Sequence, residues 1–254
     1  MPDSAVRHSS GTYRYLPAID PYSSGVAAEP GYEIVGWRFD TPTPVADAFV
    51  RLDQELAAEN LPAGALAGLA LRSPEAFSFN GFNEFNVLYR RLLTERQLLE
   101  DDVNPLARTN VVPVADGPAE PVVLAAYIVR KSSDGGGRDY VVAGSGEVDG
   151  PLDPECIVAR GDLSAEGLAR KVAYVVGEMR SRLAALGHQP ATPSLVNVYT
   201  AHEIPGLARQ LSEGLPAVHQ AGYVHWLTRP PLVEVEFEMD LNRLSGWRVL
   251  SAGA

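Results

Sequence analysis

Cysteine and lysine are both scarce in this chain of 254 residues, which has one cysteine, Cys156, and two lysines, Lys131 and Lys171. A single cysteine excludes an internal disulfide and a cysteine-rich metal site. Two lysines leave few candidates for a Schiff base to a substrate or to pyridoxal phosphate. No apolar run approaches the roughly 20 residues that a membrane helix needs, and residues 1–10 lack a signal-peptide pattern. We therefore expect a cytoplasmic protein with no membrane partner.

Motifs of several common enzyme classes are also missing. There is no Walker A motif, and Gly144-Ser145-Gly146 lacks the third glycine and the helix start of a dinucleotide-binding loop. The same segment does not form the Gly-x-Ser-x-Gly elbow of a serine hydrolase. His202-Glu203 is not followed by a zinc-site histidine, and His219 and His225 have no identifiable third ligand. The sequence thus predicts neither a metal site nor a cofactor.

The charge balance excludes another class of partner. The chain has 32 acidic against 21 basic residues, a net charge of −11. Binding to a phosphate backbone relies on clustered Lys and Arg, so nucleic acid is not expected as a partner. A hydrophobic content of 46% is ordinary for a soluble globular protein.

The first half of the chain alternates predicted strands and helices. Residues 1–31 have little periodicity and read as an extended arm, and 32–39 look like a strand. Thr43-Pro44 is a plausible helix start, with the threonine as cap. Further apolar patterns predict the remaining elements of this half: a helix face at Val45, Phe49, Leu52 and Leu56, a strand over 66–71, a second helix through 82–93, and strands over 109–114 and 122–129.

The same order of elements returns after a polar, glycine-rich segment at 131–137, which reads as a flexible linker. Ser164 is a candidate helix cap, and Gly187 stands where a left-handed residue ends a helix. The predicted elements are a strand over 140–148, a helix over 164–186, a strand over 195–200, a short helix over 204–211 and a closing strand over 232–239.

This recurrence, at a spacing of roughly 100 residues, favours an internal duplication over one α/β domain that merely alternates elements. The predicted fold is α+β, with two tandem units that each lay two helices on one face of a mixed sheet. The other face needs a second sheet to cover it. The predicted boundaries are an arm at 1–31, a first unit at 32–130, a linker at 131–137 and a second unit at 138–254.

Three segments of the second unit resemble the RidA (YjgF) family of reactive-intermediate deaminases. The strand ending in Gly144-Ser145-Gly146-Glu147 is similar to the family's Ser-Gly-Gln strand. The segment 183–199 is similar to its long helix and following strand, and 229–236 to its closing Pro-x-x-x-Val-Glu-Ile-Glu strand. The resemblance implies two YjgF-like units of the chorismate-mutase-like fold class.

The first unit resembles the family elsewhere. Asn86-Val87-Leu88-Tyr89 is similar to the family's Asn-x-x-Tyr, and Ala107-Arg108-Thr109 to the segment with its substrate-binding arginine. Family members are trimers with pockets between units, so the resemblance implies a homo-trimer of this chain with two stacked pseudo-trimers. It also implies composite pockets that pair Asn86 and Arg108 of one copy with Ser145 and Glu234 of the other.

The two units depart from the family pattern in different places. Val35-Gly36 stands where the first unit should have Ser-Gly, and Val123 where it should have the glutamate. In the second unit His219 stands where the arginine should be, either as an acid or base near neutral pH or as a remnant in an inert pocket. Each unit therefore keeps a different part of the family's pocket.

The resemblance assigns catalytic roles to Arg108, Ser145 and Glu234. Arg108 would hold a substrate carboxylate through two parallel hydrogen bonds, and a surface ion pair is its ordinary alternative. Ser145, between two glycines, allows close approach of a ligand or marks a strand bulge. Glu234 would position or deprotonate water, or is a solvated strand residue. The substrate-binding candidates are Asn86, Tyr89, Asn110, Gly146 and His219.

Three functions follow. The first is a cofactor-free hydrolytic deaminase of an imine or enamine that carries a carboxylate, in amino-aromatic catabolism or specialised metabolism. The second is another enzyme of the YjgF fold that acts on a chorismate-like cyclic carboxylate, since a fold alone does not fix chemistry. The third is a non-catalytic protein for small-molecule binding or assembly.

Overall fold

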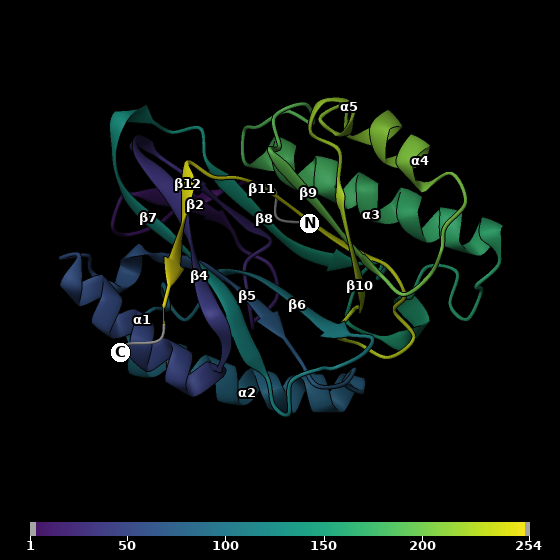
Figure 1. Ribbon diagram of the computed structural model, residues 1–254, viewed down its shortest axis with the longest axis horizontal. Helices are drawn as coiled ribbons and strands as arrows, with labels where there is room; N and C mark the ends of the chain where they lie inside the picture. Colours follow the sequence, from purple (N-terminus) through teal and green to yellow (C-terminus); the bar gives the residue numbers. More distant parts are fainter. Residues whose placement is uncertain (1–3, 252–254) are drawn as a thin grey trace.

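The computed structural model of the chain describes residues 4–251. In this range the strands form one mixed sheet of 12 strands, and the helices lie on its outer faces (Figure 1). The fold is therefore α+β, as predicted. No helix among these residues is long and apolar enough to cross a membrane.

The first half of the fold builds a four-stranded unit of the sheet with two helices. Its elements are β4 (Pro30–Pro44), α1 (Val45–Ala58), a 3-10 helix (Ala63–Ala65), β5 (Leu66–Arg72), α2 (Phe79–Glu95), β6 (Ala107–Pro113) and β7 (Val122–Gly136). The strands lie in the order β6-β5-β7-β4, with β5 and β6 parallel and the other pairs antiparallel. The apolar face predicted for the first helix is buried in the core under this sheet.

The second half repeats this topology strand for strand. Its elements are β8 (Tyr140–Gly146), a 3-10 helix (Pro154–Cys156), α3 (Ala165–Ala185), β9 (Leu195–Thr200), α4 (Leu207–Gly214), α5 (Val218–Ala221), β10 (Val224–Arg229) and β11 (Glu238–Arg243). The strands lie in the order β10-β9-β11-β8, with β9 and β10 parallel and the other pairs antiparallel. The predicted recurrence of the elements is therefore confirmed.

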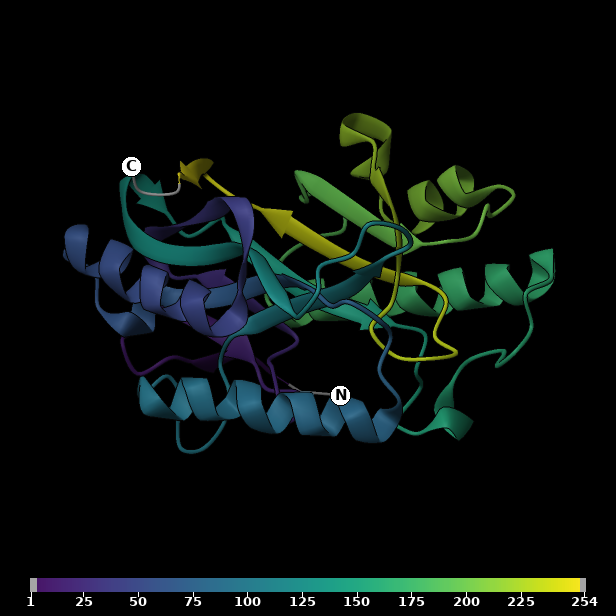
Figure 2. The same cartoon turned by 60° about the horizontal axis from the view of Figure 1, so that its bottom comes forward.

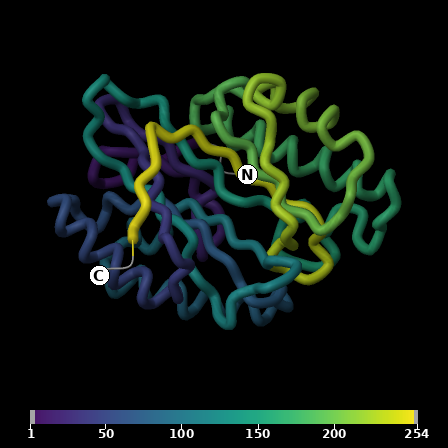
Figure 3. Tube along the Cα trace, viewed as in Figure 1, coloured from purple at the N-terminus to yellow at the C-terminus, as the bar shows by residue number. Residues whose placement is uncertain are grey.

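Each half is extended by the opposite end of the chain. The N-terminal strands β1 (Val6–Arg7), β2 (Tyr13–Leu16) and β3 (Gly25–Ala28) join the second half, where β3 pairs with β8. The C-terminal strand β12 (Gly246–Leu250) returns to the first half and pairs with β4 (Figure 3). The described part of the predicted arm thus contributes three strands and the start of β4 to the sheet, and the two halves interlock.

The two halves place their helices on opposite sides of the molecule, with the strands between them (Figures 1 and 2). The strands of the two halves join into the one sheet where β10 pairs with β6. Their inner faces share a buried apolar cluster with side chains from both halves: Tyr13, Tyr15, Val26, Ile34, Ala67, Ala107, Tyr127, Val129, Val141 and Ala143. The sheet face that the sequence analysis expected another sheet to cover is therefore covered within one chain.

Several local predictions were wrong. Residues 131–136 of the predicted flexible linker continue β7 and pair with β4, because the hairpin extends past its apolar part. Thr43 is not the cap of α1, whose N-cap is Pro44 without a side-chain hydrogen bond. The closing strand starts at Glu238, not at 232, because a turn with Glu234 in the left-handed region (φ 66°) interrupts the alternating pattern. By contrast, Ser164 caps α3 and Gly187 is left-handed, as predicted.

Candidate active site

A cavity of about 130 Å³ lies where the two halves of the chain meet. One wall comes from the first half, at α2 and β6, and the opposite wall from the second half, at β8, α3 and the start of β11. The polar or aromatic side chains at this cavity that bear on its chemistry are Tyr22, Arg108, Asn110, Ser145, Arg182 and Glu238.

Arg108 is a buried cation without a hydrogen-bonded anion. It is 3% exposed, and neither of its terminal nitrogens has a hydrogen-bond partner among residues 4–251. The guanidinium carbon instead lies 4.8 Å from the ring centre of Tyr22, 4.7 Å from that of Tyr89, and 5.6 Å from those of Phe82 and Phe85. Burial lowers the pKa of Arg108, but a guanidinium keeps its charge in proteins. Such a group can bind a carboxylate with two hydrogen bonds.

Alternation along β6 explains why Arg108 reaches the cavity. Side chains on a strand point to opposite faces in turn, so Arg108 and Asn110 share the cavity side and Thr109 points toward the second half. There the Thr109 hydroxyl donates to Asp240 Oδ2 at 2.7 Å and accepts from the backbone N–H of Gly144 at 3.0 Å. Asp240, on β11, also accepts hydrogen bonds from Asn197 and Tyr199 on β9. Its carboxylate therefore joins β6, β9 and β11.

Glu238 supplies a carboxyl group on the opposite wall. It is 5% exposed at the start of β11, beside Gly146 of β8. A Cβ atom on Gly144 would lie 2.1 Å from Glu238 Oε1, so the absence of a side chain there makes room for the carboxyl group. Burial and the neighbouring acids Asp240 and Glu147 raise the pKa of Glu238 well above its usual range, although Arg182 and Arg108 act to lower it. A carboxyl group whose pKa is raised keeps its proton to higher pH than usual, so Glu238 is suited to act as an acid.

Arg182 brings a second guanidinium to the cavity from the last turn of α3. It donates to Ser145 Oγ at 2.9 Å and to the backbone carbonyls of Ala143 and Gly144 at 3.2 and 3.4 Å. Its side chain is 15% exposed, and Glu178 lies 3.8 Å away one turn earlier. The cavity therefore has one arginine from each half of the chain.

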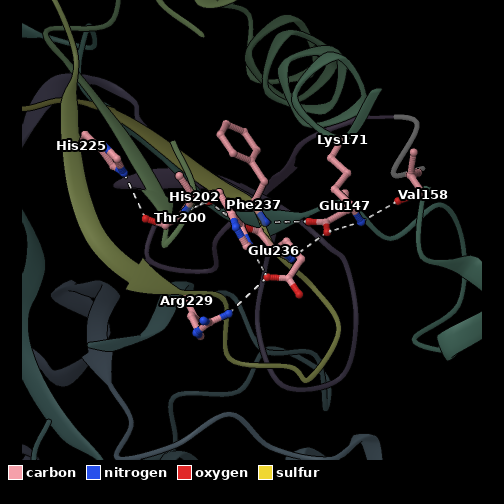
Figure 4. A network of polar contacts seen from close by, with 9 residues as sticks. All are labelled: Glu147, Val158, Lys171, Thr200, His202, His225, Arg229, Glu236 and Phe237. Atoms are coloured by element: carbon pink, nitrogen blue, oxygen red, sulfur yellow. Dashed lines mark hydrogen bonds and ion pairs between the residues drawn. The ribbon is translucent and has the colours of Figure 1, made fainter. Parts of the chain in front are cut away.

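A buried ion pair behind the cavity holds the segment between β10 and β11 (Figure 4). Lys171 and Glu147 are fully buried and 3.1 Å apart. Lys171 also donates to the carbonyl of Val158 at 2.9 Å, and the Glu147 carboxylate accepts from the backbone N–H groups of Glu236 and Phe237 at 2.7 and 3.0 Å. The pair thus fixes the backbone that leads into Glu238.

The structure brings together four of the residues singled out in the sequence. Arg108, Asn110, Ser145 and Gly146 all line the cavity, so the expected pairing of Arg108 with Ser145 occurs inside one chain. Asn110 exchanges hydrogen bonds with Ser73. Tyr89 lies directly behind the cavity, with its ring against Arg108.

The other three residues lie apart from the cavity. Glu234 is on an exposed turn, where Arg160 donates to both of its carboxylate oxygens, at 3.1 and 2.9 Å. His219 is exposed on α5. Asn86 is buried on α2 and lines a neighbouring cavity. Among the described residues no cluster of three or more His, Cys, Asp and Glu could hold a metal ion.

Sequence reasoning missed Glu238 and Arg182. Glu238 has the same parity as Glu234 in the alternating segment 232–239, so parity alone could not separate them. Arg182 has the i,i+4 spacing to Glu178 of an ordinary surface ion pair. Arg182 stands three residues after Met179 and next to Leu183, both on the buried face of α3. This position was the sequence feature that could have indicated a charged side chain pointing toward the interior.

A buried arginine among aromatic rings and a second arginine lie at one cavity with a buried carboxyl group whose pKa is raised, which defines an enzyme pocket for a small anionic substrate, with acid–base chemistry. A family model described as "2-aminomuconate deaminase CnbZ" matches residues 5–247. A 2-amino-5-chloromuconate deaminase from Comamonas testosteroni is 42% identical over 250 residues, which cover 95% of this chain and 97% of that protein. The chain belongs to the CnbZ family of 2-aminomuconate deaminases. It is therefore a deaminase and a hydrolase, which decides among the three predicted functions in favour of the first.

Solved structures show more remote similarities. A chorismatase has a TM-score of 0.47 at 14% identity, and the match covers 95% of this chain and 79% of that chain. A putative endoribonuclease from Thermotoga maritima has a TM-score of 0.28 at 20% identity, covering 52% of this chain and 91% of that chain.

Proposed function

We propose that this chain converts 2-aminomuconate, or a ring-cleavage product like it, to the corresponding keto acid and ammonia in the cavity between its halves. The single observation that carries this proposal is the buried guanidinium of Arg108, whose terminal nitrogens have no hydrogen-bond partner among residues 4–251, opposite the buried carboxyl group of Glu238. Membership of a deaminase family and the repeated topology support it. We also infer that each half is a diverged unit of the RidA type, as the sequence motifs suggest.

Substrate binding in this scheme begins at Arg108. 2-Aminomuconate is an enamine whose amino-bearing carbon lies next to a carboxylate. Arg108 binds that carboxylate with two charge-assisted hydrogen bonds, which its unpartnered terminal nitrogens leave available. The surrounding rings of Tyr22 and Tyr89 exclude water from the guanidinium, so the interaction is stronger than at a surface. This contact places the reacting carbon near Glu238.

Glu238 then moves the protons. Its carboxyl group protonates the enamine carbon next to the amino-bearing carbon, which gives an iminium ion and the Glu238 carboxylate. Water adds to the C=N carbon, and the Glu238 carboxylate takes a proton from that water. The resulting carbinolamine transfers its hydroxyl proton to nitrogen, the C–N bond breaks, and ammonia leaves as the ketone forms. Glu238 is protonated again, and the balance is enamine plus water to ketone plus ammonia.

Ser145 and Arg182 complete the proposed site. Ser145 Oγ accepts a hydrogen bond from Arg182 and donates a long one, 3.5 Å, to the carbonyl of Gly146, a bond that substrate or the attacking water would replace. Asn110 and Gly146 form part of the wall. Holding the carboxylate, the C=N carbon and water in one place supplies much of the rate enhancement.

The test compares ammonia release from 2-aminomuconate by three glutamate variants. Glu238→Gln should lower kcat by roughly 100- to 10,000-fold, the usual contribution of a general acid–base residue. Glu213→Gln, at an exposed glutamate of α4, is the matched control and should act as wild type. Glu234→Gln separates the residue that the family resemblance indicated from the one in the cavity. A loss confined to Glu234→Gln would contradict the proposal.

A further inference from the structure

The active-site cavity contains two arginines that differ in their surroundings. Arg108 lies among aromatic rings, and within the described part of the chain both of its terminal nitrogens lack a hydrogen-bond partner. Arg182 lies on the other half of the chain and also lines an adjoining cavity, of about 930 Å³, that runs past Ser145 and Glu178. The first arginine is therefore at the interior end of the site, and the second is where the site continues outward.

We propose that Arg182 binds the second carboxylate of the substrate and makes the pocket selective for dicarboxylates. This inference rests on the proposed function, in which Arg108 binds the first carboxylate. A muconate skeleton is a conjugated six-carbon chain with one carboxylate at each end. Conjugation keeps it planar and stiff, so it cannot fold both carboxylates onto one guanidinium. A site for such a molecule needs two cations on either side of the reacting carbon.

The hydrogen bonds of Arg182 leave it capable of this role. A guanidinium has five N–H donors. The three acceptors around Arg182, Ser145 Oγ and the carbonyls of Ala143 and Gly144, fix its position and leave donors for a ligand. Glu178, at 3.8 Å, is its nearby counter-charge and is not hydrogen-bonded to it. A preorganised, partly buried guanidinium pays little entropy on binding a carboxylate.

The charges around the cavity support a substrate position between the two arginines. Arg108 and Arg182 both act to lower the pKa of Glu238 and of the Tyr22 hydroxyl, although burial raises both. Glu238 and Tyr22 are thus within electrostatic reach of both guanidiniums. A substrate that spans from Arg108 to Arg182 passes beside Glu238, where the proton transfer is proposed.

A purely structural role is the competing explanation, since Arg182 also holds the end of β8. Calorimetric titration with two unreactive ligands separates the roles. Muconate has two carboxylates, and sorbate has the same conjugated six-carbon chain with a methyl group in place of one carboxylate. Wild type should bind muconate at least roughly tenfold more tightly than sorbate, the effect of charge-assisted hydrogen bonds to one more carboxylate.

Arg182→Met should remove this difference and leave the affinity for sorbate within about twofold of wild type. Arg182→Lys should restore part of it, because lysine keeps the charge but not the two-pronged geometry. Arg180→Met, at an exposed arginine on the same helix, makes the same change of net charge and should leave the difference intact. Melting temperatures of all variants show whether the fold is kept.

An unchanged preference for muconate in a folded Arg182→Met would overturn the inference, as would a wild type that does not distinguish the two ligands. A loss of affinity for both ligands alike would indicate the structural role and also overturn it. These titrations need no turnover. The role of Arg182 can therefore be disproved even if the protein releases ammonia in a Glu238-dependent way. If the protein releases no ammonia, the preference for muconate over sorbate can still be measured.

Discussion

Replacement of Lys171 by methionine removes one partner of the buried pair with Glu147. Both side chains are fully buried, and the Glu147 carboxylate stays bound to the N–H groups of Glu236 and Phe237 after the change. Breaking such a pair costs about 3–5 kcal/mol, because the remaining charge is left without its partner. For a chain of this size that corresponds to a fall in Tm of roughly 6–20 °C.

The loss should depend on pH. Burial raises the pKa of Glu147, and Lys171 is one of the groups that lower it. Without Lys171 the pKa in the folded state rises further, whereas the unfolded value stays near about 4.3. A raised pKa means that folding favours the protonated form, so stability falls as the pH rises above the unfolded value. Lys171→Met should therefore be more destabilising at pH 8 than at pH 5.

Thermal and denaturant unfolding at both pH values measure this prediction. Lys131→Met, at the other lysine, is exposed and should change stability by less than about 0.5 kcal/mol. Adding Glu147→Gln to Lys171→Met should recover part of the loss, because the uncompensated charge is gone. A loss below about 1 kcal/mol, or an equal loss at both pH values, would refute the reasoning.

Three further predictions concern the site and the assembly. Gly144→Ala should lower kcat while the variant stays folded, because its methyl group would displace the Glu238 carboxyl group. A kcat equal to that of wild type would contradict this close packing. Because the proposed reaction needs the protonated form of Glu238, whose pKa burial raises, kcat should fall as pH rises through that pKa, and Glu238→Gln should remove this limb of a stopped-flow pH profile. The chain should sediment as a trimer, as the family resemblance implies, and a stable monomer would contradict this.

The local elements could be predicted from the sequence because their signals are local. The spacing of Phe49, Leu52 and Leu56 depends only on the helical repeat, and Ser164 caps α3 through a hydrogen bond within one turn. The sequence also indicated the repeat, because both halves use the same succession of periodicities. These features need no knowledge of distant parts of the chain.

The exchange of terminal strands could not be predicted in the same way. Strand β12 pairs with β4 across most of the chain length, and β3 pairs with β8 across the whole first half. Nothing in Gly246–Leu250 specifies a partner so far away, and the residues before β3 mix turns with short strands. Pairing of this kind is decided by which sheet edge is open in the folded molecule.

The position of Glu238, the proposed acid of the site, illustrates a second limit. The alternation of valine and glutamate over 232–236 indicates a strand, yet Glu234 adopts a left-handed conformation and pairs with Arg160. The backbone N–H groups of Glu236 and Phe237 bind the Glu147 carboxylate in place of a neighbouring strand. Because Glu147, distant in sequence and buried, binds these N–H groups, strand β11 begins only at Glu238. No sequence pattern within 232–239 indicates this later start.

The measurement that tests the central claim most directly is ammonia release from 2-aminomuconate by Arg108→Met beside wild type. The account predicts fast release by wild type. In the variant it predicts a fall in kcat/KM of roughly 10- to 150-fold, which corresponds to the loss of about 1.5–3 kcal/mol of charge-assisted hydrogen bonding. A folded Arg108→Met with the kcat/KM of wild type would contradict the claim that the reaction takes place in the cavity between the two halves.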